Sequence, residues 1–198
     1  MNNIAPKWYG EAAQSIAPIG IMMSVFLLVY TIWFGFAWGA IGWSFFILSV
    51  LLASLICAKS VKNMRHSKLF EKNESVEGKR IGKAMGILSG VSYGILWLFV
   101  ILLFIFNLYI FIMPVVTLVI GLHFIPQAKI MNRKIDYYVA PLPIFTALIA
   151  IYLAIQTDVS LLSVYAIASI GGALATSIYG VYLLITYKTL AKEVGVDY

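Results

Sequence analysis

The chain has 198 residues, of which 62% are hydrophobic and 11% are charged, and its formal net charge is +6. A soluble domain carries about 25% charged residues. This composition therefore excludes an ordinary soluble globular protein, a disordered chain and a nucleic-acid-binding domain. A helix that crosses a membrane needs about 20 apolar residues, so the hydrophobic share of the chain is enough for about six such helices.

Stretches without Asp, Glu, Lys or Arg divide the chain further. Two long stretches without these residues cover the ranges 12–58 and 84–128, which are 47 and 45 residues long. Two shorter ones cover 137–157 and 159–187, which are 21 and 29 residues long. A helix of 47 residues would reach about 70 Å, whereas a hydrocarbon core is about 30 Å thick. We therefore expect each long stretch to fold back and cross twice, and each short one to cross once.

These stretches predict an all-α polytopic integral membrane protein with six transmembrane helices in a single bundle domain over residues 1–198. Gly35, Gly39 and Gly42 lie among tryptophans, which favour the membrane boundary, so we expect the first turn there. The second turn is expected near Asn107. The predicted spans lie near 16–34, 41–58, 82–106, 108–125, 139–156 and 161–187.

The basic residues predict the orientation of the helices. Eight of the fourteen Lys and Arg residues lie in the range 59–83, and the others lie in the N-terminal segment, in 129–134 and in the C-terminal tail. With six spans, all fourteen fall on one side, and Asp158 is the only charge in the opposite loops. The positive-inside rule then places both termini in the cytoplasm. We expect a multi-pass protein of the cell inner (plasma) membrane that contacts membrane lipids through anionic headgroups, with no nucleic-acid partner.

A stripe of small residues follows the third predicted span. Gly82, Gly86, Gly90 and Gly94 are spaced four apart, which places them on one face of a helix. Such stripes let helices approach closely. Two interpretations stay open: the stripe packs helices within one subunit, or it is the seam of a homodimer or of a contact with another membrane protein.

Polar side chains inside a membrane are the first candidates for function. His123 precedes Lys129 by six residues, or about 9 Å of helical rise, so it is expected near the cytoplasmic boundary. Pro126 cannot donate a backbone hydrogen bond to the carbonyl of Leu122, which leaves a free acceptor beside the histidine. His123 is either a structural histidine or a proton-sensitive gate or ligand contact. The predicted ligand-binding residues are His123, Pro126, Gln127 and Tyr138.

The acidic residues near the spans have simple interpretations. Asp136 follows Arg133 and Lys134, so an exposed ion pair is expected there. Glu11 lies four residues after Lys7, and the two are expected to pair on a helix face.

The sequence shows no pattern of catalytic or metal-binding residues. It contains no intramembrane carboxylate pair, no HExxH segment and no Cys–His pairing, since Cys57 is the only cysteine. We therefore predict no catalytic residue set, no metal site and no cofactor.

The segment Gly121-Leu122-His123-Phe124-Ile125-Pro126, followed by paired tyrosines and by Ala140-Pro141, resembles an uncharacterised family of small bacterial multi-pass membrane proteins with a G-x-H-F-x-P segment. The resemblance covers the range 121–141. It implies that the junction between the fourth and fifth spans is a defining feature, and it implies no activity.

The sequence leaves two functions open. The leading one is a membrane protein that binds or passes a small or lipid-like ligand near His123, and a polar cavity reaching that residue would favour it. The alternative is a non-catalytic accessory or structural subunit of a larger membrane complex, favoured by an exposed Gly82–Gly94 face. An enzyme would need a second titratable group within hydrogen-bond reach of His123.

Overall fold

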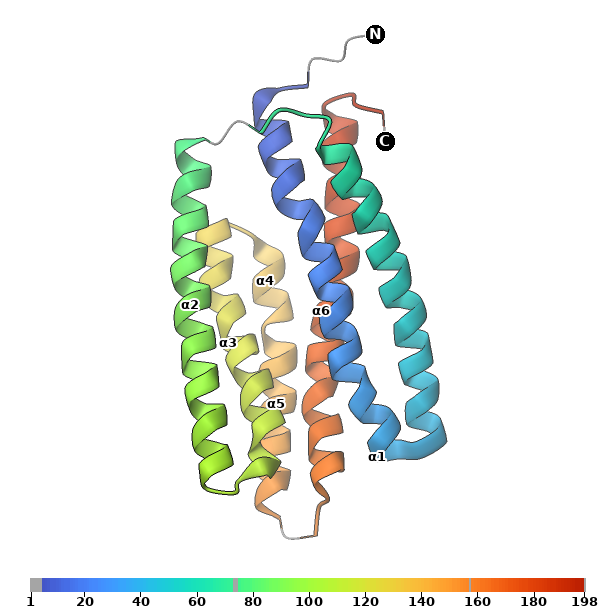
Figure 1. Ribbon diagram of the computed structural model, residues 1–198, viewed down its shortest axis with the longest axis vertical. Coiled ribbons are helices and arrows are strands. Elements are labelled where there is room, and N and C mark those ends of the chain that lie inside the picture. The colour runs from blue at the N-terminus through green and yellow to red at the C-terminus, as the bar shows by residue number, and fades with distance from the viewer. Residues whose placement is uncertain (1–4, 73–74, 157, 198) are drawn as a thin grey trace.

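The computed structural model describes residues 5–72, 75–156 and 158–197, which form a bundle of helices without strands (Figure 1). The all-α class is confirmed. Five helical segments in these residues are long and apolar enough to cross a membrane, with α4 and α5 counted as one. The elements are α1 (Lys7–Ser67), α2 (Val76–Ile105), the 3₁₀ helix η1 (Tyr109–Phe111), α3 (Ile112–Met131), α4 (Lys134–Val139), α5 (Pro141–Ile155) and α6 (Leu161–Glu193).

Helix α1 folds back on itself at Gly39. This residue has φ +56° and ψ −132°, a conformation that glycine adopts more readily than any other residue. The first arm (residues 7–38) and the second arm (residues 40–67) lie side by side (Figure 1). A Cβ atom added at Gly20 in the first arm would overlap the Ser60 hydroxyl in the second. The reversal falls in the glycine- and tryptophan-rich stretch where the sequence predicts a turn.

Helix α6 is the central element, and it packs against α1, α3 and α5. Small residues allow this contact: a Cβ atom added at Gly172 would overlap the ring of Tyr30 in α1. The Thr146 hydroxyl of α5 donates to the carbonyl of Ala168 in α6 at 3.2 Å. These close approaches are the packing mode of membrane helices, whose association cannot draw on burial of apolar surface from water.

Helix α2 is the outermost helix of the bundle (Figure 1). It packs mainly against α3, with a smaller contact to η1, and Leu96 is its only buried residue. Cβ atoms added at Gly82, Gly86, Gly90 and Gly94 would meet nothing within 4 Å in the described residues. The stripe therefore does not pack helices together within the described part of the chain.

The start of α1, the α1–α2 connection and the end of α6 lie at the same end of the bundle (Figure 1). The side-chain amide of Gln14 donates to the carbonyl of Phe70 at 2.8 Å. The Glu11 carboxylate accepts from the backbone N–H of Ser75 at 3.2 Å, at the N-terminus of α2, where the helix dipole favours an anion. The Lys7 side chain of the predicted Lys7–Glu11 pair lies outside the described residues, and Glu11 instead fixes the start of α2.

The helices run past several predicted span limits. Helix α2 begins at Val76 rather than near 82, and α6 continues to Glu193 rather than ending near 187. Helix α3 continues through Pro126 to Met131, beyond the predicted limit at 125. The predicted limits follow the charge-free stretches, whereas a helix keeps its backbone hydrogen bonds beyond the apolar region.

Candidate functional site: a seam between α2 and α3

His123 lies in α3 and faces α2. Its Nδ1 atom is 3.0 Å from the Ser92 hydroxyl of α2, and its ring centroid is 6.2 Å from that of Tyr93. The side chain is half-buried. This hydrogen bond is a specific link between α2 and α3, the helix against which α2 mainly packs.

A small cavity lies beside this pair. It measures about 20 Å³, enough for about one water molecule by the same measure. It is lined by Ser92, Tyr93, Leu96, Val119, Ile120 and His123. The polar groups thus line a space between α2 and α3 that the two helices do not fill.

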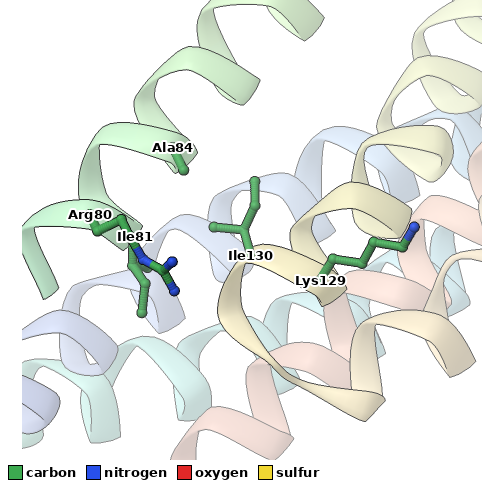
Figure 2. A pocket seen from close by; sticks show the side chains of 5 residues that line it. All are labelled: Arg80, Ile81, Ala84, Lys129 and Ile130. Atoms are coloured by element: carbon green, nitrogen blue, oxygen red, sulfur yellow. The ribbon is translucent and has the colours of Figure 1, made fainter. Parts of the chain in front are cut away.

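A larger hollow opens in the same seam toward the end of the bundle where α2 begins. It measures about 300 Å³ and is lined by Arg80, Ile81 and Ala84 of α2 and by Lys129 and Ile130 of α3 (Figure 2). The two hollows share no lining residue, and we call them together the α2–α3 cleft. Its outer end is cationic and apolar, and its inner end holds the Ser92–His123 pair.

A second polar cluster lies one helical turn beyond His123, between α3, α4 and α6. The Gln127 side-chain amide donates to Asp136 at 2.9 Å and to the Tyr179 hydroxyl at 3.1 Å. Asp136 is fully buried, and its Oδ2 atom is 3.5 Å from Nε of Arg133. The Arg133 guanidinium carbon also lies 5.5 Å from the centroid of the Tyr179 ring, a distance that allows a cation–π contact.

This cluster corrects one expectation. Asp136 does pair with Arg133, but the pair is buried rather than exposed, because Asp136 belongs to a row of buried positions at helical spacing. The row continues through Val139, Pro143 and Ala147. That spacing is visible in the sequence and could have identified Asp136.

The predicted ligand-binding residues are only partly brought together. His123 lines the cleft, and Gln127 is buried in the second cluster but also interacts with the His123 side chain. Pro126 is half-buried in α3 between them. Tyr138 is 75% exposed and shares no contact with the cleft residues in the described part of the chain. Sequence analysis missed the roles of Ser92 as partner of His123 and of Tyr179 as partner of Gln127.

The Ser92–His123 pair has the atoms of a nucleophile and a base, and an acyl-transfer site needs further groups around such a pair. Such a site needs a group that orients the other imidazole nitrogen and donors for an oxyanion. His123 hydrogen-bonds through Nδ1 to Ser92 and also interacts with the Gln127 side chain and with Asp136. Ser92 lies in mid-helix, where backbone N–H groups are engaged within the helix.

Comparison of the chain with protein-family models, with curated proteins and with solved structures finds no match. The interpretation of the site therefore rests on its geometry and chemistry.

Proposed function

We propose that this protein is a multi-pass membrane protein that binds a lipid-like ligand in the α2–α3 cleft, with the Ser92–His123 pair at the inner end. The observation that carries the proposal is the position of His123. It is a polar side chain in an apolar helix, and it faces a partly open seam rather than the filled core. Polar groups in such positions are expensive in a membrane and mark ligand sites.

The membrane arrangement is part of the proposal. The two arms of α1, together with α2, α3, α4–α5 and α6, would make six passes through the cell inner membrane, with both termini cytoplasmic. The hairpin at Gly39 supports six passes, because it makes the two arms of α1 run in opposite directions and each arm would then be a separate pass. The orientation is supported by the segments rich in Lys and Arg, which lie toward the same end of the bundle. Reporter fusions at the C-terminus and in the 156–160 loop would report opposite sides.

The binding test compares the wild type with Ser92→Ala and His123→Ala in neutral detergent. Long-chain amphiphiles are added, and the shift in unfolding temperature is measured for each protein between pH 5.5 and 8.5. We expect a ligand shift in the wild type that both variants reduce. Ser89→Ala is the matched control, because Ser89 lies one turn away on α2 and does not line the cavity. Equal shifts in all four proteins would refute a site at His123.

A second function is favoured by a different observation. The Gly82–Gly94 stripe faces outward and contacts nothing in the described residues, although a small-residue stripe is suited to close helix packing. The protein would then be an accessory subunit or a homodimer that docks through α2. Gly86→Leu should disrupt such a complex, which the molecular mass of the detergent-solubilised protein would show. Self-association through this face is contradicted if the wild type is a monomer, or if the Gly86→Leu variant keeps the molecular mass of a wild-type complex.

A further inference from the structure

We propose that the ligand of the α2–α3 cleft is an anionic phospholipid whose headgroup binds at the outer hollow, which Arg80 of α2 and Lys129 of α3 line. This inference rests on the proposed function, because it names the class of lipid-like ligand that the cleft takes. It concerns the outer end of the cleft, which the Ser92–His123 pair does not reach.

The outer hollow combines two chemistries. Arg80 and Lys129 line the hollow from its two helices together with Ile81, Ala84 and Ile130, and in the view of Figure 2 the Lys129 amine is directed away from Arg80. Its volume of about 300 Å³ lies at the lower limit of small-molecule sites, which are about 300–1,000 Å³. A headgroup with the first carbons of its chains fits these dimensions better than a whole lipid does.

The two cations lie at the depth that lipid phosphates occupy. Arg80 precedes the charge-free range 84–128, and Lys129 follows it directly. The helices α2 and α3 that bear them run antiparallel and are joined at their far ends, so both cations lie at the same end of the seam. In a membrane, the apolar stretch between them fills the hydrocarbon region, and the cations lie at its boundary with the headgroups.

The pair is suited to a phosphate in particular. An arginine guanidinium can give two parallel hydrogen bonds to phosphate oxygens, and a lysine adds a mobile positive charge. Glu77 competes for Arg80, with 2.7 Å between Oε1 and the guanidinium nitrogen. Both side chains are well exposed, at 59% and 77%, so this pair is weak and leaves Arg80 available.

The apolar surface argues for a lipid rather than a soluble phosphate. Ile81, Ala84 and Ile130 offer nothing to a hydrated ion, but they would cover the glycerol and the first methylene groups of an acyl chain. The small cavity at Ser92 and His123 is a separate hollow between the same two helices, farther from the end at which α2 begins.

The test measures binding to the full-length protein in neutral detergent by native mass spectrometry. The probes are phosphatidylglycerol, phosphatidylcholine with the same acyl chains, and inorganic phosphate. The test variant is Arg80→Gln with Lys129→Gln. Its control is Lys79→Gln with Lys188→Gln, which removes the same charge from the same end of the molecule but from exposed residues outside the hollow. All four side chains are exposed, so neither variant disturbs the core.

We expect the wild type and the control to prefer phosphatidylglycerol to phosphatidylcholine. The test variant should bind phosphatidylglycerol about thirtyfold more weakly, about fivefold for each cation lost. Equal phosphatidylglycerol binding by test and control variants would overturn the proposal. The proposal would also be overturned if inorganic phosphate bound as tightly as phosphatidylglycerol, because the hollow would then be an ion site without a lipid.

The two proposals can fail separately. If phosphatidylcholine binds as tightly as phosphatidylglycerol, and its binding depends on His123, the anionic headgroup is wrong and the lipid-binding function survives. If neither lipid binds in a manner sensitive to substitution of Ser92 or His123, or of the two cations, both proposals are wrong.

Discussion

Replacing Asp136 with alanine is the sharpest test of the buried cluster between α3, α4 and α6. Asp136 is fully buried, accepts a hydrogen bond from Gln127 at 2.9 Å and lies 3.5 Å from the Arg133 guanidinium. The substitution removes an acceptor and a negative charge together. It leaves the guanidinium, whose side chain is 16% exposed, without its counter-ion.

The expected magnitude follows from these contacts. Removing one partner of a buried ion pair costs about 3–5 kcal/mol, because the other charge stays buried and uncompensated. Here the contact between Nε and Oδ2 is too long for a hydrogen bond, and Arg133 keeps some access to water, which favours the lower end of that range. The lost hydrogen bond from Gln127 to a carboxylate adds to it, although Gln127 keeps the Tyr179 hydroxyl as acceptor. We expect the free energy of unfolding to fall by about 3 kcal/mol.

The assay is reversible unfolding in mixed micelles of neutral detergent and dodecyl sulfate, followed by circular dichroism. Asp158→Ala is the control, because Asp158 is an exposed aspartate at the opposite end of the bundle, and its loss should change stability by less than about 0.5 kcal/mol. The double variant lacking both Arg133 and Asp136 should lose less stability than the two single variants summed, because no buried charge is left unpaired. The reasoning is refuted if Asp136→Ala is as stable as the control, or if the two single effects add.

Other substitutions test the packing of the bundle by the same unfolding assay. Gly172→Ala places a methyl group against the Tyr30 ring and should destabilise by about 1–3 kcal/mol. Gly86→Ala, on the open face of α2, should be neutral or stabilising by up to about 1 kcal/mol, since alanine favours helices; equal losses at the two sites would contradict the assigned packing. Glu11→Gln weakens the contact with the Ser75 N–H and should cost about 0.3–1 kcal/mol, an effect that disappears in high salt. A salt-independent loss would rule out the helix-dipole interaction.

The class of fold could be predicted from the sequence because the membrane imposes it. A charge-free stretch of sufficient length has few alternatives to a spanning helix, and the glycines near position 39 mark where such a helix reverses. The arrangement of the helices could not be predicted. Helices α2 and α6 are both apolar and glycine-rich, yet α6 is central and α2 is outermost. In a soluble protein an amphipathic pattern would distinguish them, but a lipid-facing surface is as apolar as a packed one.

Of the candidate site residues, His123 and Gln127 could be predicted from the sequence, whereas their partners Ser92 and Tyr179 could not. His123 stands out because few polar side chains occur inside the apolar stretches. Its partner Ser92 is one of several hydroxyl residues on α2, and nothing in its local sequence distinguishes it. Asp136 was expected to be exposed because two basic residues precede it, whereas the helical row to which it belongs buries it. Tyr138 lies on the opposite side of that row and is exposed for the same geometric reason.

The peripheral position of α2 has a consequence for the energetics of the fold. The free energy of local unfolding rises with the number of contacts that must be broken, so different elements of one protein unfold locally with different free energies. Detaching α2 from α3 would break the Ser92–His123 bond and expose Leu96, while the contacts among α1, α3, α5 and α6 stay intact. Amide protons in the middle of α2 should therefore exchange with solvent faster than those of α6.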